Sequence, residues 1–163
     1  AIHAGWNEKL KHLLFQFAFD KISEIRYILN MDLSVIEEDL GLVETSFQSY
    51  LASRVPLIAK IGTHILNSGG KRIRPAILLL SARLNGYRGE RAIRMASIVE
   101  FIHTATLLHD DVVDNADIRR GTPAANTLWG SEASVLVGDF LFSKSFYLMV
   151  EDGSLKILKI LAG

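Results

Sequence analysis

The sequence predicts an all-α fold, and three observations lead to that prediction. Apolar residues recur at steps of three and four along most of the chain, which is the period of one helix face. No segment shows the alternation of polar and apolar residues that marks a convincing strand. The 163 residues include only three prolines, and the glycines cluster between the periodic segments. Long helices with short breaks account for all three observations.

Each break marks the place where we expect one helix to end and the next to begin. Apolar stripes over residues 6–30 and 33–53 predict two amphipathic helices. Pro56 suits the first turn of a third helix, which stops at Ser68-Gly69-Gly70. The remaining helices are expected at residues 73–84, 89–114, 131–150 and 154–161.

Residues 1–30 allow two interpretations. They form either an extra N-terminal helix or an extension upstream of a start at Met31. Residues 31–163 have a usual length for one domain, since domains contain about 100–200 residues.

Composition excludes several classes of protein. The 18 basic and 18 acidic side chains balance, whereas proteins that bind nucleic acid normally carry a basic excess, so we expect no nucleic-acid partner. The absence of cysteine excludes disulfides, thiolate zinc sites and a cysteine nucleophile, and it fits a reducing, cytoplasmic compartment. No apolar run approaches the roughly 18 residues of a membrane span.

Four aspartates lie within eight residues at the end of an otherwise apolar helix, at Asp110, Asp111, Asp114 and Asp117. On a helix, Asp110 and Asp114 are one turn apart, so their carboxylates can converge. Two such like charges repel unless a divalent cation lies between them, and ligands that are all oxygen favour Mg²⁺. Asp111 is rotated by about 100° and is expected to be a supporting or weaker ligand. The alternative, a solvated acidic helix end, is disfavoured because acidic groups there oppose the helix dipole.

Two basic segments accompany the aspartates. Adjacent Arg119 and Arg120 suggest an anion that is held jointly by guanidinium groups and a bound cation, and a diphosphate fits this description. In Ser68-Gly69-Gly70-Lys71-Arg72-Ile73-Arg74-Pro75, the glycines let the backbone approach an anion, and Lys71 and Arg74 can share a helix face. The alternative for this second segment is a glycine helix stop followed by a solvated basic turn.

Two histidines lie on the same predicted helix as the aspartates. His103 precedes Asp110 by two turns on the same stripe, so it either donates hydrogen bonds to an anion or is a core histidine. His109 points elsewhere and is expected to have a packing or capping role.

Together these motifs resemble the trans-isoprenyl diphosphate synthase family, most closely its bacterial long-chain, octaprenyl-type members. The resemblance covers about residues 33–163 and is carried by GGKRIRP at 69–75, EFIH at 100–103 and LLHDDVVDNADIRRG at 107–121. It implies an isoprenoid-synthase-type helical bundle around a central cavity, and a homodimer. It also implies a prenyltransferase that adds isopentenyl diphosphate head-to-tail to an allylic diphosphate, such as farnesyl diphosphate.

The resemblance assigns roles to individual residues. It implies that Asp110 and Asp114 bind the Mg²⁺ that grips the allylic diphosphate, and that Arg119 contacts this diphosphate; these three form the catalytic set. The isopentenyl diphosphate would be held by Lys71, Arg74, His103 and Arg120.

The length of the prenyl product follows from side-chain volume in this family. Bulky residues four or five positions before the first motif aspartate form the floor of the cavity. Those positions are Thr106 and Ala105 here, and both side chains are small. We therefore expect a long product, in the range of quinone side chains.

The family's second aspartate-rich motif is absent from the sequence. Residues 31–163 are therefore expected to hold the N-terminal part of such a synthase and to be unable to complete catalysis alone. Three alternatives stay open: a non-catalytic regulatory subunit, a class I terpene synthase, and an HD-type phosphohydrolase with His109 and Asp110 as joint ligands. The GGKRIRP segment disfavours the terpene synthase, which binds no second diphosphate substrate.

Overall fold

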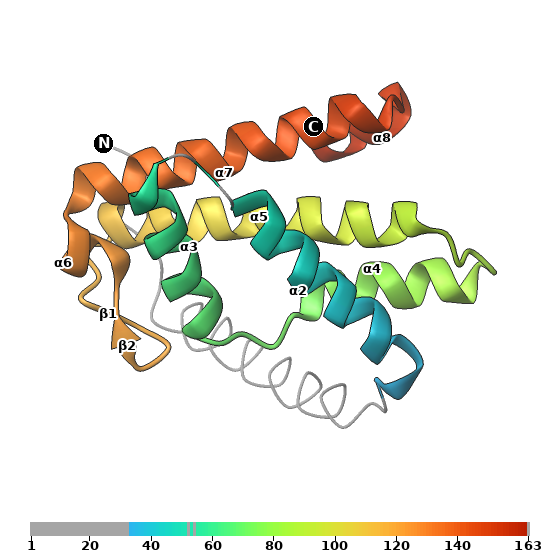
Figure 1. Ribbon diagram of the computed structural model, residues 1–163, viewed down its shortest axis with the longest axis horizontal. Coiled ribbons are helices and arrows are strands. Elements are labelled where there is room, and N and C mark those ends of the chain that lie inside the picture. The colour runs from blue at the N-terminus through green and yellow to red at the C-terminus, as the bar shows by residue number, and fades with distance from the viewer. Residues whose placement is uncertain (1–32, 52, 54, 163) are drawn as a thin grey trace, which may run out of the picture. The chain divides into compact units, whose positions relative to one another are not determined.

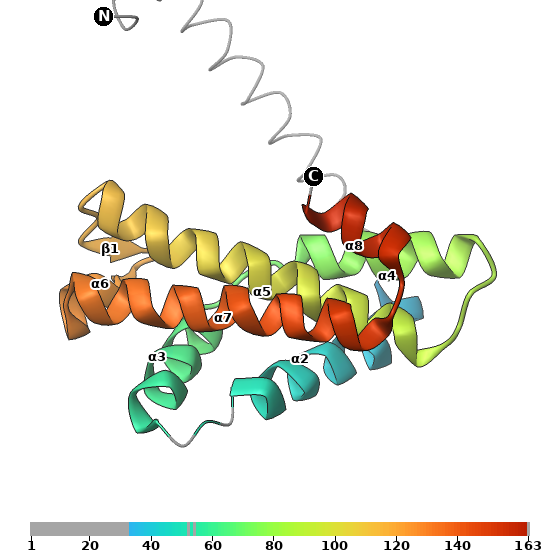
Figure 2. The ribbon, with the colours of Figure 1, turned by 90° about the horizontal axis from the view of Figure 1, so that it is seen from above.

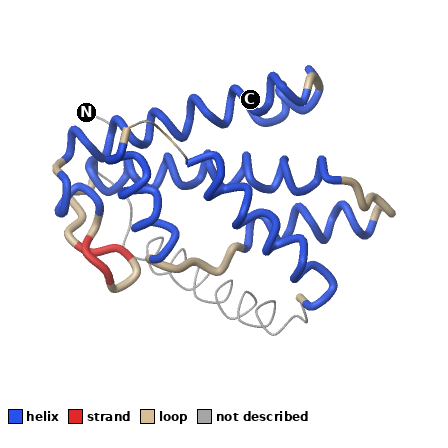
Figure 3. The backbone as a smooth tube through the Cα atoms, in the orientation of Figure 1, coloured by secondary structure: helices blue, strands red, loops and turns tan. Residues whose placement is uncertain are grey.

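In the computed structural model, residues 33–51, 53 and 55–162 are described, and most of them are helical (Figures 1 and 3). The elements are η1 (Ser34–Ile36), α2 (Glu37–Leu51), α3 (Pro56–Asn67), α4 (Ile73–Leu84), α5 (Glu90–Val113), β1 (Ile118–Arg119), β2 (Thr122–Pro123), α6 (Ala125–Trp129), α7 (Ser131–Asp152) and α8 (Leu155–Ala162). The predicted all-α fold class is confirmed. Contacts divide the chain between Val35 and Ile36, so the account below concerns the unit that begins at Ile36.

Helices α5 and α7 lie side by side and antiparallel (Figures 1 and 2), and α7 runs along the upper edge of the view in Figure 1. Small residues of α7 allow the close approach. The Ser134 hydroxyl donates to the Leu108 backbone oxygen at 3.2 Å. A methyl group at Gly138 would overlap the imidazole ring of His109, so glycine is required by the packing at this point.

The apolar core surrounds α5, which is buried on several faces. Phe101 of α5 stacks on Phe47 of α2, with ring centroids 4.2 Å apart. Arg83 of α4 pairs with Asp39 of α2 at 2.6 Å, which ties these two helices together beside α5. The core cluster consists of Phe47, Leu51, Ile61, Met95, Ile98, Phe101, Ala105, Leu108, Ala125, Val137, Leu141, Leu148 and Met149.

Most predicted helices are found close to their expected ends. The third and fourth expected helices correspond to α3 and α4, and the segment expected at 33–53 divides into η1 and α2. The helix expected at 6–30 lies outside the described residues.

A short hairpin and α6 were not expected from the sequence. The two strands of the hairpin are only two residues long and pair Arg119 with Thr122, too short to show alternation in the sequence. Arg120 and Gly121 form the turn between them with φ values of 52° and 80°. Positive φ at both central residues is the signature of a type I′ hairpin turn.

Helix α7 is long and apolar enough to cross a membrane by length and composition, which the sequence analysis did not expect of any segment. Core helices of globular proteins pass the same test. Because α7 buries Val137, Leu141 and Leu148 in the core, this helix is weak evidence for a span. The absence of a membrane span stays a prediction.

Candidate functional site

The acidic cluster occupies the C-terminal end of α5, where the chain closes the helix with a Schellman motif. Asn115 adopts a left-handed conformation with φ of 51°, and the Ala116 N–H returns to the Asp111 backbone oxygen at 2.9 Å. The Asp114 N–H donates to the Asp110 backbone oxygen at 2.8 Å, so helical geometry persists to Asp114. The two carboxylates are therefore one turn apart, as expected, and both residues are exposed.

Asp111 behaves differently from its neighbours. Its side chain is only 4% exposed, and its Oδ1 atom accepts from Arg119 Nε and Nη2, both at 2.6 Å. The hydrogen bond to Asp111 raises the pKa of the Arg119 guanidinium. Asp111 therefore acts as a buried anchor for Arg119, and its carboxylate is occupied by that pair.

The basic residues surround a cavity of about 550 Å³ beside the first turn of α4. It is lined by Ser68, Gly70, Lys71, Arg72, Ile73, Arg74, Glu100, His103 and Arg120. The structure thus brings together all four residues that the sequence analysis assigned to one diphosphate. Lys71 and Arg74 are exposed and have no ion pair among the described residues, so both remain free to meet an anion.

Arg72 is the one cavity cation that is already neutralised. It pairs with Glu44 at 2.5 Å and Glu100 at 3.1 Å. Burial alone would lower the pKa of Arg72, but the hydrogen bonds and charges of the two glutamates outweigh burial and raise it. Arg72 has φ of 47°, a left-handed conformation that directs the chain into α4. It therefore braces the loop, and only Lys71, Arg74 and Arg120 are left as available cations in this lining.

His103 lies beside these free cations. Burial, together with the charges of Arg74, Arg120 and Arg119, lowers the pKa of His103 to about 4, and the charge of Asp110 opposes this shift. The imidazole is therefore neutral at physiological pH and offers one N–H donor to an anion. These effects indicate that residues of both basic segments, together with Asp110, lie near the His103 ring.

The remaining predicted residues lie apart from the cavity. Ala105 is fully buried in the core, whereas Thr106 is exposed and its hydroxyl donates to the His103 backbone oxygen at 2.7 Å. The two therefore do not share one surface of the described unit.

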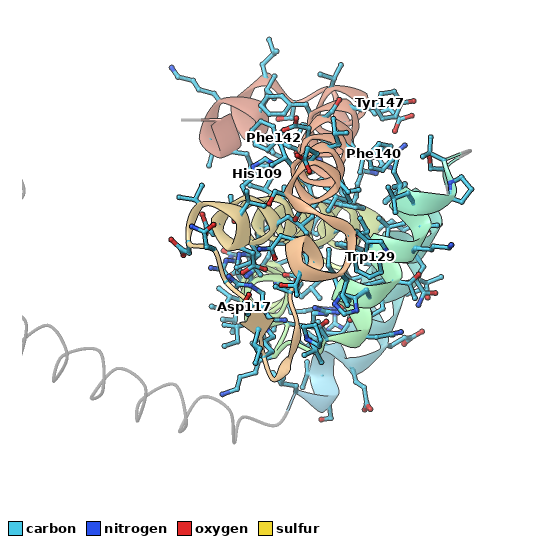
Figure 4. All side chains as sticks on the ribbon, turned by 90° about the vertical axis from the view of Figure 1, so that its left-hand side faces the viewer. His109, Asp117, Trp129, Phe140, Phe142 and Tyr147 are labelled. Atoms are coloured by element: carbon cyan, nitrogen blue, oxygen red, sulfur yellow. The ribbon has the colours of Figure 1, made fainter. Side chains whose placement is uncertain are left out.

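His109 has the packing role that the sequence analysis expected. Its ring lies between α5 and α7 (Figure 4), with Nε2 3.3 Å from the Val135 backbone oxygen and 3.4 Å from Asp139 Oδ1. Within the described ranges, no three metal-ligating side chains gather at one point. The contacts of His109 with α7 therefore disfavour a phosphohydrolase in which His109 and Asp110 are joint ligands.

Several structurally important residues of the site were missed. The partners of Arg72 lie 28 residues away on either side of it, and no local pattern connects them. Asn126 donates from Nδ2 to the backbone oxygens of Asp111 and Ala116 at 3.1 Å each, which ties α6 to the end of α5. Such long-range contacts leave no periodic signal in one sequence.

A family model described as Polyprenyl synthetase matches residues 55–163. Octaprenyl diphosphate synthase of Escherichia coli (strain K12) is 49% identical over 125 residues, which cover 77% of this chain and 39% of that protein. The chain thus spans well under half the length of such curated relatives.

Two solved structures share the fold at similar identity. A decaprenyl diphosphate synthase from Rhodobacter capsulatus matches with a TM-score of 0.77 and 47% identity, over 79% of this chain and 40% of that one. A polyprenyl synthase from Caulobacter crescentus CB15, described as complexed with calcium and isoprenyl diphosphate, also matches with a TM-score of 0.77 and 47% identity, over 80% and 40%.

Proposed function

The chain belongs to the polyprenyl synthetase family, and from that premise we propose that it supplies both diphosphate sites of a long-chain trans-polyprenyl diphosphate synthase. The reaction adds isopentenyl diphosphate head-to-tail to an allylic diphosphate. The observation that carries this proposal is a cavity with three free cations, situated beside a helix end that presents two carboxylates.

The cavity is the proposed isopentenyl diphosphate site. Lys71, Arg74 and Arg120 supply three positive charges, and Glu100, the acidic residue in the lining, is already paired with Arg72. The neutral imidazole of His103 adds an N–H donor without adding charge. Guanidinium groups suit a diphosphate because their planar forks donate two parallel hydrogen bonds to its oxygens.

Asp110 and Asp114 are the proposed ligands of Mg²⁺ at the allylic site. Mg²⁺ is typically held by one or two carboxylates, with water and substrate phosphates completing its coordination. Two exposed carboxylates one helical turn apart fit that donor set, and the occupied carboxylate of Asp111 fits a supporting role. When bound, the metal supplies positive charge for the oxygens of the allylic diphosphate.

The protein's part in the chemistry is to stabilise charge that grows on the leaving diphosphate as the allylic C–O bond ionises. Arg119 is suited to this role because Asp111 fixes its orientation before substrate arrives. A donor that is already in position stabilises the transition state without a further free-energy cost of reorganisation. The double bond of isopentenyl diphosphate then attacks the allylic cation, and loss of a proton completes the addition.

The proposal extends to the primer, the product length, the oligomeric state and the location of the enzyme. Farnesyl diphosphate is the proposed primer. The small side chain of Thr106, which is exposed, favours a product in the range of quinone side chains, whereas Ala105 is also small but lies in the core. We also propose a homodimer located in the cytoplasm.

The test is incorporation of labelled isopentenyl diphosphate into prenyl chains by the full-length gene product, with farnesyl diphosphate and Mg²⁺. We expect elongation that EDTA abolishes, and a raised KM for isopentenyl diphosphate in Arg74→Gln. Thr45→Val, on α2 and outside the cavity, is the control. No elongation by the wild-type protein, or elongation that only a second protein's active site supports, would contradict the proposal and favour a regulatory subunit.

A further inference from the structure

Arg120 is held differently from Arg119, and the difference points to a further residue that serves the site. Arg119 is fixed by the buried carboxylate of Asp111. The Arg120 residue is exposed, and its Nη1 donates to the backbone oxygen of Gly69. A methyl group at Gly70 would overlap the same Nη1 atom. The place of Arg120 therefore depends on where the hairpin backbone lies relative to the loop of residues 69–70.

The base of the hairpin is held by its own flanking residues and by α6. The Ala124 N–H donates to the Asp117 backbone oxygen at 2.9 Å, and Asn126 Nδ2 donates to the Ala116 backbone oxygen at 3.1 Å. Both contacts involve residues outside the β1–β2 pair. They leave the turn that carries Arg120 to be positioned by other contacts.

The second strand of the hairpin is held by the last turn of α3. His64 Nε2 lies 2.9 Å from the backbone oxygen of Pro123, and because a carbonyl oxygen only accepts, this nitrogen carries the proton. The Thr122 hydroxyl lies 3.1 Å from Ser68 Oγ and 2.9 Å from the Arg119 backbone oxygen. The last turn of α3 and the residue that follows this helix therefore contact both residues of β2.

The C-terminal end of α3 thus connects to both the hairpin that carries Arg120 and the loop that carries Lys71. Ser68 donates to the His64 backbone oxygen at 2.7 Å and leads directly into the loop that carries Lys71. The ring of His64 is itself fixed edge-on against Trp129 of α6, with centroids 5.1 Å apart and planes at 73° (Figure 4 labels Trp129). His64 is thereby oriented from one side and donates to the hairpin from the other.

We propose that His64 is a positioning residue that sets the place of Arg120 in the basic cavity, acting through Pro123 and the hairpin. This inference rests on the function proposed above, since it assigns Arg120 to isopentenyl diphosphate. His64 itself touches no substrate. Its effect is therefore expected on the binding of isopentenyl diphosphate and not on the ionisation of the allylic substrate.

The variants separate the hydrogen bond of His64 from its packing. His64→Phe keeps an aromatic ring against Trp129 but lacks the donor, so we expect the KM for isopentenyl diphosphate to rise about threefold to tenfold. The kcat and the KM for the allylic diphosphate should change much less. His64→Gln retains an N–H donor and should restore most of the lost affinity. Thr122→Val should raise the same KM, while the matched control Thr45→Val, which removes a hydroxyl bonded within α2, should not.

Steady-state kinetics of the full-length gene product, with each substrate varied in turn, test this inference. A selective rise in the KM for isopentenyl diphosphate that His64→Gln reverses supports it. An unchanged KM in His64→Phe, or a fall in kcat alone, overturns the positioning role and leaves the proposed function intact. If His64→Phe does not fold, Thr122→Val decides the question by the same criterion. An inactive wild-type protein contradicts the proposed function instead.

Discussion

Removal of Arg119 is expected to destabilise the protein more than removal of Asp111, although the two side chains form one ion pair. The Asp111 side chain is 4% exposed, whereas that of Arg119 is 32% exposed. After Arg119→Ala, the Asp111 carboxylate stays buried without its partner. After Asp111→Ala, the guanidinium of Arg119 can turn toward water. The structure therefore predicts an asymmetry between the two variants.

The magnitudes follow from burial. Breaking a fully buried ion pair by removing one partner typically costs about 3–5 kcal/mol. Because Arg119 is one-third exposed and partly screened, we expect Arg119→Ala to lower the free energy of unfolding by about 2–3 kcal/mol. Asp111→Ala leaves no buried charge and should cost about 1–2 kcal/mol. The double variant should cost less than the sum of the two, since both remove the same interaction.

Urea unfolding of the full-length gene product, followed by circular dichroism in EDTA without diphosphates, measures these differences. The absence of ligands matters because ligand binding would add its own stabilisation. Asp117→Ala removes an exposed carboxylate of the same segment and should stay within about 0.5 kcal/mol of wild type. The reasoning is refuted if Asp111→Ala is as costly as Arg119→Ala, or if Arg119→Ala matches the control.

Three further predictions concern other parts of the site. Gly138→Ala should destabilise the protein by about 1–3 kcal/mol because the added methyl meets the His109 ring, and His109→Ala should relieve much of that loss in urea unfolding; equal costs in both backgrounds would contradict the packing. Thr106→Phe should shorten the products seen by chromatography without disturbing the core, and unchanged product lengths would exclude Thr106 as a floor. The pKa of His103 is about 4 in the folded protein and about 6.5 in the unfolded chain, so the unfolded chain binds a proton here at a higher pH. The free energy of unfolding of the wild type should therefore fall relative to that of His103→Asn between about pH 6.5 and about pH 4, and parallel pH profiles would contradict this.

Sequence patterns predicted the helices and the grouping of the basic residues well, because both depend on local signals. Pro56 and the glycines after Ser68 determine the ends of α3, and the apolar period determines its buried face. The one-turn spacing of Asp110 and Asp114 survives in the structure because the helix continues until Asn115. The separate role of Asp111 was anticipated as support, but its partner was not.

The contacts that position the site were not predictable, since they join residues far apart in the chain. Arg72 looked like a member of the anion-binding motif, yet Glu44 and Glu100 neutralise it from two other helices. His64 carried no pattern, and its contact to Pro123 spans 59 residues. A hairpin of two-residue strands has no periodicity to detect. These features become visible only when the helices have been packed together.

The most direct test of the central claim is the effect of Mg²⁺ on binding of an unreactive farnesyl thiodiphosphate to the full-length gene product, measured by calorimetry. The account predicts that Mg²⁺ strengthens binding by about tenfold or more. It predicts that the Asp110→Asn, Asp114→Asn double variant loses this enhancement while Asp117→Asn retains it. Binding that ignores Mg²⁺, or an enhancement that survives in the double variant, would contradict the assignment of these two carboxylates.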